Sequence, residues 1–465
     1  MSIETQLRRP GLWEALTPVV ALVVFIVAQI QVFEGDPHIP LILASAVAAW
    51  MAARVGARWS DIEEGILEGI RIGLKAILIL MVVGMMISLW IAGGVAPTLI
   101  DYGLMVLSPR FFLLATCLIC SVVSLATGSS WTTASTVGVA LMGVGVGLEA
   151  NPAMVAGAVV SGAYFGDKMS PLSDSTNLAP AVAGAELFEH IRAMLVTTGP
   201  AWVLALVLYG IIGWTQGATG ANVETVEAIR EALGASFQLD AWALTAPALV
   251  IVLILFRLPA LPVLLAAAFW GGVLAMWRQG ASLDSILEVA HYGYVSETGF
   301  ERVDDLLSAG GLDSMMWTVS LVLCALSFGG IMERAGMLQR LADAALNRVR
   351  GVGGLVATTT GTAMGLNVIA PDQYLSIIGA GRMYRSAYRD RGLSPKLLSR
   401  TLEDGGTLTS PLVPWNTCGA FMFNALGVSP LAYLPFAFLN LAAPLIGILL
   451  AFAGIAVARD RPSGA

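Results

Sequence analysis

The stretch GDKMSPLSDSTN at residues 166–177 decides how the rest of this chain can fold. It sets two carboxylates, a lysine and several hydroxyls between apolar runs, and Pro171 near its centre interrupts any helix and frees backbone carbonyls. Non-helical backbone at membrane depth is tolerated only where protein buries it or where it lines a cavity. The segment therefore predicts a broken helix that is enclosed by other membrane helices.

The chain around this segment has the composition of a polytopic membrane protein. Of its 465 residues, 57% are hydrophobic and 12% are charged, and the mean hydropathy is +0.79. A membrane-spanning helix needs roughly 20 largely apolar residues. Uncharged runs of about that length or longer occur at residues 15–33, 76–98, 111–148 and 405–458. We therefore expect an all-α integral membrane protein with about 10 to 12 membrane elements.

Basic residues predict how the chain is oriented. Residues 382–400 hold six basic side chains against Asp390 alone, whereas the stretch 224–240 is acidic. Because cytoplasmic loops are enriched in Lys and Arg, we expect a multi-pass protein of the cytoplasmic (inner) membrane with both termini in the cytoplasm. The same rule uses the arginines near the first two runs and at the end of the chain, which are Arg8, Arg9, Arg54, Arg58, Arg459 and Arg461.

The first apolar run and one pair of cysteines each have a simple structural interpretation. The first apolar run lacks a small-residue cleavage site, so we interpret it as an anchor and not as a removed signal. Cys117 and Cys120, three residues apart, have the spacing of metal ligands on a helix, but buried small side chains are the simpler interpretation.

Two short strings recur and indicate an internal repeat. ATG at residues 126–128 is echoed by AMG at residues 363–365, and SPL at residues 170–172 recurs at residues 410–412, with offsets of 237 and 240 residues. Many secondary transporters are built from such repeats. Laying the repeats over each other at the two serines places Asp174 on Pro414, so the second half lacks the matching carboxylate.

Four regions follow from this organisation. Two amphipathic stretches, residues 61–71 and 281–312, are expected to lie along the interface or to be ordinary connectors. The regions are N-terminal spans with an interfacial helix (1–70), repeat 1 (71–214), an acidic external loop with connecting spans and an amphipathic insertion (215–312), and repeat 2 (313–458).

The run at residues 111–148 is too long for one span, and its middle is polar. Residues 127–136 contain seven hydroxyl side chains beside Gly128. Such side chains offer oxygen lone pairs and compete for backbone hydrogen bonds. We expect an unwound stretch or re-entrant tip here; hydroxyls that link helices are the alternative.

The oxygen-rich break in the first half predicts a cation site. Carboxylate, hydroxyl and amide oxygens are hard ligands that suit a small alkali cation, and a carboxylate can hold either the ion or a proton. Asp174 has no basic neighbour within the motif, so it is our first choice for the titrating residue, with Na+ bound at Asp174 and Asn177. Lys168 either couples transport or forms a structural pair with Asp167. The predicted ligands in this half are Asp167, Ser170, Ser173, Asp174, Thr176 and Asn177.

The second half offers two further breaks, marked by Pro371 and by Pro411 with Pro414. Glu403 and Asp404 have a coupling or gating role in this interpretation; the alternative is a surface pair beside Arg400. The predicted ligands contributed by this half are Asn367, Asp372, Asn416 and Thr417.

At these residues the chain resembles the NhaC family of sodium/proton antiporters. The resemblance rests on GDKMSPLSDSTNLA at residues 166–179 and PWNTCGA at residues 414–420, and supporting segments extend it over about residues 120–430. The family implies two inverted repeats with broken helices or re-entrant hairpins, a scaffold and a transport domain, a homodimer and an elevator-type mechanism. Relatives in the family also exchange small carboxylates such as malate and lactate.

The expected function is secondary exchange of Na+ or Li+ for H+, with Na+/H+-coupled exchange of small carboxylates as the alternative. The alternative requires a cationic side chain at membrane depth, for which Lys168 is the obvious candidate. No phosphate-binding loop motif and no histidine–serine arrangement supports an ATP-driven pump or an enzyme, and paired interrupted halves favour a carrier over a channel. We expect membrane lipids and a small cation as partners, and neither a cofactor nor nucleic acid.

Overall fold

The computed structural model describes residues 8–33, 35–216, 223–256, 258–346 and 349–459. Within these ranges the chain is helical without a strand, and the single isolated β-bridge joins Leu393 to Arg459. Seven helices in the described part are long and apolar enough to cross a membrane, and up to nine spans result if each of two bent helix pairs counts as one. The all-α membrane class predicted from composition is therefore confirmed.

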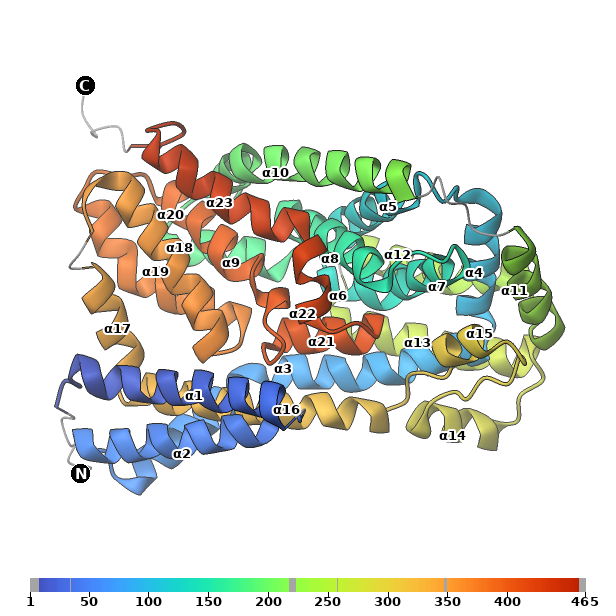
Figure 1. Ribbon diagram of the computed structural model, residues 1–465, viewed down its shortest axis with the longest axis horizontal. Coiled ribbons are helices and arrows are strands. Elements are labelled where there is room, and N and C mark those ends of the chain that lie inside the picture. Colours follow the sequence, from blue (N-terminus) through green and yellow to red (C-terminus); the bar gives the residue numbers. More distant parts are fainter. Residues whose placement is uncertain (1–7, 34, 217–222, 257, 347–348, 460–465) are drawn as a thin grey trace.

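One layer of the molecule consists of long helices that lie side by side along its length (Figure 1). The helix α3 is its centre and packs against α2, α13, α14 and α16, while α1 packs against α2. These helices are α1 (Leu12–Val32), α2 (His38–Val55), α3 (Trp59–Ala92), α13 (Ala260–Arg278), α14 (Leu283–Tyr292), η4 (Asp313–Met315) and α16 (Met316–Arg334).

The second layer contains the broken helices. Its closest helix pair is α5 with α8, and α10 packs against α23. Its elements are α5 (Phe112–Thr127), α6 (Ser130–Thr133), η1 (Ala134–Gly138), α7 (Val139–Gly147), α8 (Pro152–Met169), α9 (Asp174–Ala183), α10 (Leu187–Gln216), α18 (Gly351–Ile369), α19 (Gln373–Arg389), α20 (Pro395–Leu402), η5 (Glu403–Thr407), η6 (Ser410–Leu412), α21 (Thr417–Leu426), α22 (Pro430–Tyr433), η7 (Leu434–Phe436) and α23 (Phe438–Phe452).

The remaining elements connect the two layers and lie at both ends of the molecule (Figure 1). In Figure 1, α11 lies at the end opposite to the one where α1 begins and α23 finishes. These connecting elements are α4 (Val95–Val106), α11 (Val223–Ser236), η3 (Ala241–Leu244), α12 (Thr245–Leu255), α15 (Glu301–Leu307) and α17 (Met337–Leu346).

Glycines allow α3 and α16 to approach closely. A Cβ atom added at Gly330 would lie 2.1 Å from the carbonyl oxygen of Gly65, and one added at Gly69 would lie 2.4 Å from that of Leu326. Small residues at such positions let membrane helices approach backbone to backbone. Residues 61–71, which were expected to form a separate interfacial helix or a connector, are instead the first turns of α3, which is continuous from Trp59 to Ala92.

The predicted breaks are confirmed at the prolines and at Gly128. Gly128 has a left-handed backbone (φ 68°) between α5 and α6, and α8, α18 and η6 are each followed by an interruption. The helices restart behind the capping residues Ser129, Ser173, Asp372 and Asn416.

These caps give a better register for the internal repeat. Ser129 and Ser173 are 44 residues apart, and so are Asp372 and Asn416, so one offset of 243 residues relates both pairs. The offset of 237 residues is wrong, because residues 363–365 lie inside α18, whereas Gly128 ends α5. The two SPL strings at residues 170–172 and 410–412 do both lie at a break. In the corrected register the counterpart of Asp174 is Thr417 instead of Pro414.

Replacing Gly330 with Ala should destabilise the protein by about 1–3 kcal/mol, because the added methyl group must displace the backbone of α3. Thermal unfolding of the purified protein in detergent measures this effect as a lower midpoint. Gly361→Ala is the matched control, since nothing lies within 4 Å of its Cβ position. Equal midpoints for the two variants would show that the α3–α16 contact is not tight.

Candidate functional site

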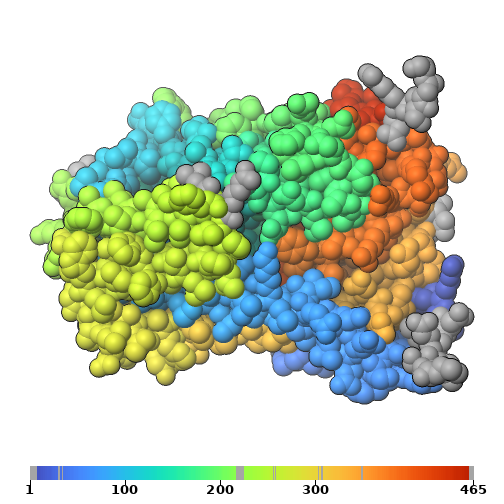
Figure 2. All heavy atoms as spheres, turned by 180° about the vertical axis from the view of Figure 1, so that it is seen from behind, coloured from blue at the N-terminus to red at the C-terminus, as the bar shows by residue number. Residues whose placement is uncertain are grey.

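A cavity of about 740 Å³ opens where the two layers meet. In Figure 2 the surfaces of α3 (blue), α13 (yellow-green), α10 (green) and the segments around residue 380 (orange) adjoin near the middle of one face. The polar residues that line the cavity come from both breaks of the first half, from both breaks of the second half and from α3. They are Lys75, Thr127, Ser129, Ser130, Thr132, Asp167, Ser173, Asp174, Ser175, Asp372, Gln373, Tyr374 and Thr417.

Among the described residues, Asp167 is one of two buried carboxylates that line this cavity, the other being Asp372. It occupies the last turns of α8, and only 6% of its surface is exposed. Ser130 donates a hydrogen bond to Oδ2 at 2.6 Å, and Ser173 donates one to Oδ1 at 2.5 Å. The two serines come from different breaks, because Ser130 opens α6 and Ser173 caps α9. Asp167 therefore brings the oxygen atoms of both first-half breaks together.

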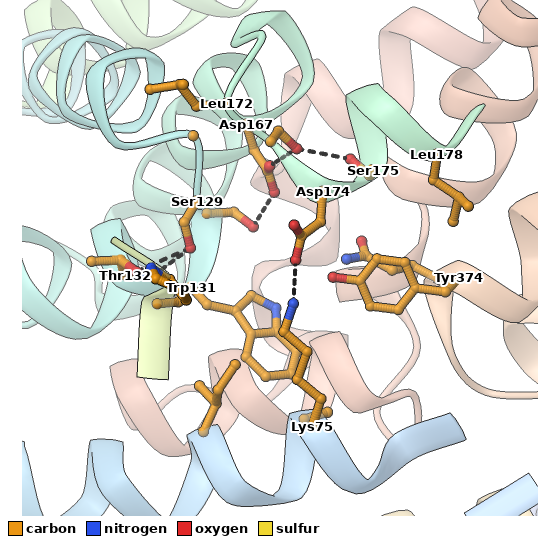
Figure 3. A pocket seen from close by; sticks show the side chains of 18 of the residues that line it. Lys75, Ser129, Trp131, Thr132, Asp167, Leu172, Asp174, Ser175, Leu178 and Tyr374 are labelled. Carbon is orange, nitrogen blue, oxygen red and sulfur yellow. Dashed lines mark hydrogen bonds and ion pairs between the residues drawn. The ribbon is translucent and has the colours of Figure 1, made fainter. Parts of the chain in front are cut away.

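Asp174 has a different environment from the one expected for the first-choice titrating residue. Its Oδ2 atom accepts a hydrogen bond from the Lys75 ammonium of α3 at 2.6 Å, and the two side chains are 60% and 61% exposed (Figure 3). Asp174 has no basic neighbour within residues 166–177, but in the fold Lys75 of α3 is its basic partner. A partner 99 residues away in sequence could not be read from the motif.

The break before α19 contributes one carboxylate and one hydroxyl to the cavity. Asp372 is buried and caps α19, because its Oδ1 atom accepts hydrogen bonds from the backbone N–H groups of Tyr374 and Leu375 at 2.8 and 3.2 Å. Thr417, at the start of α21, donates to Oδ2 of Asp372 at 3.1 Å. Both predicted residues thus face the same cavity as Asp167.

Five predicted ligands do not line the cavity. Their side chains hold the breaks together instead. The amide of Asn177 donates to the carbonyls of Pro171 and Ser173 at 2.9 and 2.7 Å, so the structure does not support Na+ between Asp174 and Asn177. The other four make similar bonds to neighbouring backbone or side-chain atoms, and they are Ser170, Thr176, Asn367 and Asn416.

Lys168 and Asp404 form a buried ion pair behind the cavity, and the two side chains are 0% and 3% exposed. The Thr197 hydroxyl also donates to Asp404 at 3.1 Å. The alternative pairing of Lys168 with Asp167 is therefore wrong, because the lysine extends to the second half of the chain. The alternative that places Glu403 and Asp404 on the surface is also wrong, since both are buried.

Sequence reasoning missed several residues of the cavity. Ser130 belongs to the hydroxyl-rich stretch that the sequence singled out, so that stretch contained the signal, although no individual residue was chosen. Trp131 and Tyr374 lie on opposite sides of the Lys75–Asp174 pair (Figure 3). Only their positions directly after two helix breaks could have suggested them.

The arrangement suits a monovalent ion bound by hard oxygens. One buried carboxylate with two hydroxyls can balance a single positive charge, and each hydroxyl oxygen keeps a lone pair while it donates to the carboxylate. Within the described ranges no three His, Cys, Asp or Glu side chains are grouped to hold a metal ion. The cavity therefore offers hydroxyl oxygens beside separate carboxylates, and in the described ranges these carboxylates do not form a group of three.

Comparisons with known proteins agree with this geometry. Residues 162–455 match the family described as the Na+/H+ antiporter family. The chain is 41% identical over 441 residues to the Na(+)/H(+) antiporter NhaC of Alkalihalophilus pseudofirmus, covering 95% of each chain. It is 38% identical to the Na(+)/H(+) antiporter NhaC of Bacillus subtilis, over 92% of this chain and 94% of that one.

A third relative carries a different name. It is the Malate-2H(+)/Na(+)-lactate antiporter of Bacillus subtilis, with 36% identity over 96% of both chains. The matches to the antiporters extend almost from end to end, and the family match includes the first-half motif and all of the second half. The resemblance predicted from the motifs is confirmed, and the chain belongs to the Na+/H+ antiporter family.

Proposed function

We propose that this protein exchanges Na+ or Li+ for H+ across the cytoplasmic membrane, and that Asp167 is the residue for which the two cations compete. The observation that carries the proposal is a buried carboxylate that joins hydroxyls from two helix breaks at the wall of a cavity. The names of the relatives that match over the whole chain support it.

Competition at Asp167 is sufficient to couple the two fluxes. The ionised carboxylate binds Na+ together with the hydroxyl oxygens of Ser130 and Ser173, and protonation removes the negative charge and releases the ion. If the carrier changes its exposure only when Asp167 holds one of the two cations, each Na+ moved one way requires a proton moved the other way. Asp372 and Thr417 assist from the second half of the chain, which lines the same cavity.

The buried charges behind the cavity form the coupling network of this proposal. Glu403 begins the π-helical turn η5 and is fully buried. Neither of its carboxylate oxygens has a hydrogen-bond partner in the described part of the chain. Because Asp404 already pairs with Lys168, Glu403 is the buried carboxylate of this network that has no partner among the described residues.

Alternating exposure requires one layer to move relative to the other. We propose that α3 and α16 belong to the scaffold and that the layer with the broken helices moves as the transport domain of an elevator. The exposed Lys75–Asp174 pair joins the two layers and would have to open during this movement. The homodimer, the inverted relation of the repeats and the cytoplasmic placement of both termini belong to the same proposal.

Exchange of a small carboxylate is the second candidate function. The cavity is far larger than one alkali ion, and Lys75 lines it with an exposed ammonium. Lys168, the cation expected for this role, is buried in its pair with Asp404 and does not line the cavity. The name of the Bacillus subtilis malate/lactate antiporter adds support.

Asp167→Asn should weaken Na+-driven proton movement by about a hundredfold, because it removes the charge that holds the ion. The experiment uses purified protein in proteoliposomes and follows the internal pH after Na+, Li+, K+ or malate is added outside. Asp284→Asn, which changes an exposed carboxylate on α14, is the matched control.

Two outcomes would contradict the assignment. Unchanged exchange in Asp167→Asn would remove Asp167 from the site, and Asp174→Asn would then be the next variant. A response of the wild type to malate but not to Na+ alone would replace Na+/H+ exchange with the second candidate function.

Lys168→Met should lower stability by about 3–5 kcal/mol, because it leaves the Asp404 carboxylate buried without its partner. The double variant Lys168→Met/Asp404→Leu removes both charges and should regain most of the loss in thermal unfolding. A double variant as unstable as the single one would mean that the pair itself is not what limits stability.

Glu403→Gln keeps the shape of the side chain but cannot take up a proton. If Glu403 belongs to the proton route, this variant should bind Na+ normally while its exchange rate depends less on pH than that of the wild type. Na+ binding is measured calorimetrically, and exchange in proteoliposomes over a pH series. An unchanged pH profile would exclude Glu403 from the route.

A further inference from the structure

A second cavity lies away from the transport site, between α10, α20 and the segment that follows α23. It measures about 440 Å³. In Figure 2 the surfaces of α10 (green), of the segments near residue 400 (orange) and of the end of α23 (red) adjoin on one side of the molecule. The lining residues with charged side chains are Glu189, Arg192, Lys396 and Arg400.

Arg400 is the central residue of this cavity. Its side chain is 98% buried, yet its Nε and Nη2 atoms have no hydrogen-bond partner within the described residues. The guanidinium makes one contact, from Nη1 to the carbonyl oxygen of Ala456 at 3.5 Å. Burying a cation without a paired anion costs free energy of folding. A negatively charged group bound beside Arg400 would offset this cost.

The other charges leave the cavity positive. Glu189 is the one acidic residue among the described residues that line it, and its carboxylate lies 3.7 Å from the Lys396 ammonium. Glu186 lies near Arg192, but its two oxygens accept hydrogen bonds from the backbone N–H groups of Phe188 and Glu189 at the start of α10. Among the residues that the structure describes, Arg192 and Arg400 therefore remain without a carboxylate of their own.

We propose that this cavity binds a phosphate group through Arg192, Lys396 and Arg400. The guanidinium fork matches the geometry of phosphate oxygens, and the excess of two positive charges matches a phosphate dianion or the phosphate of an anionic lipid. Basic pockets between membrane helices are typical sites for lipid headgroups. The phosphate comes either from free inorganic phosphate or from a lipid at the membrane surface.

A bound phosphate would connect the cavity to the coupling network. Arg400 lies three residues before Glu403, and Arg192 lies on the same helix as Thr197, which donates to Asp404. His190 and Ser399 already link α10 to α20 by a 2.6 Å hydrogen bond. An anion held by both helices would fix their relative position, which is the position that aligns Thr197 with Asp404.

Ligand-dependent stability tests this proposal without any transport measurement. Thermal unfolding of the detergent-purified protein is followed with increasing inorganic phosphate, added as its choline salt. Choline chloride at equal ionic strength is the reference. A second arm compares lipid nanodiscs of phosphatidylcholine with nanodiscs of equimolar phosphatidylcholine and phosphatidylglycerol. If the site takes free phosphate, the unfolding midpoint should rise to a plateau with phosphate in detergent; if it takes a lipid headgroup, the midpoint should rise in the phosphatidylglycerol nanodiscs.

Variants show whether that rise comes from the cavity. Arg192→Gln/Lys396→Gln should weaken half-saturation about tenfold or more, because it removes two charge-assisted contacts, one from an exposed and one from a half-buried position. Arg400→Gln should lose the response as well. The control Arg350→Gln/Arg389→Gln removes the same charge from exposed arginines outside the cavity and should behave as wild type.

The arms distinguish the sources, and each result has a defined meaning. A response to phosphate in detergent identifies a free anion, and a response only in the phosphatidylglycerol discs identifies a lipid headgroup. Absence of a saturable response in both arms would overturn the proposal. A response that the cavity variants retain in full would overturn it as well.

Discussion

Each helix that restarts in the polar core of this protein exposes backbone N–H groups that hydrocarbon cannot pair. In the structure a side chain solves this problem at every one of the four restarts: Ser129, Ser173, Asp372 and Asn416 each accept from a backbone N–H at the start of the helix that follows. The caps are therefore the condition under which the breaks can exist at membrane depth.

The same requirement positions the transport site. Ser173 caps α9 and at the same time donates to Asp167, and Asp372 caps α19 and accepts from Thr417. Ligand oxygens consequently have fixed directions, because the helices that carry them would lose their caps if those side chains turned away. The identical spacing of the caps in the two halves explains how one architecture produces both walls of the cavity.

The three lysine and arginine environments differ in what they contribute. Lys168 is buried with Asp404 and holds the two halves together, whereas Lys75 is exposed and joins the two layers through Asp174. Arg400 is buried without an acidic partner among the described residues, close to the turn that carries Glu403. The buried Lys168–Asp404 pair is suited to a permanent link, and the exposed Lys75–Asp174 pair to one that opens and closes. Arg400 is suited to binding an external anion.

The amino-acid sequence by itself determined the class of the fold, the sites of the breaks and the family. Long uncharged runs predict membrane helices, and Pro171, Pro371, Pro411 and Gly128 among polar side chains predict where they are interrupted, because both rules depend only on neighbouring residues. Tertiary structure alone decided the partners of the charges. Lys75 reaches Asp174 across 99 residues and Lys168 reaches Asp404 across 236, and no local pattern encodes such distances. For the same reason the motif pointed to Asp174, while packing buried Asp167 between two serines from different breaks.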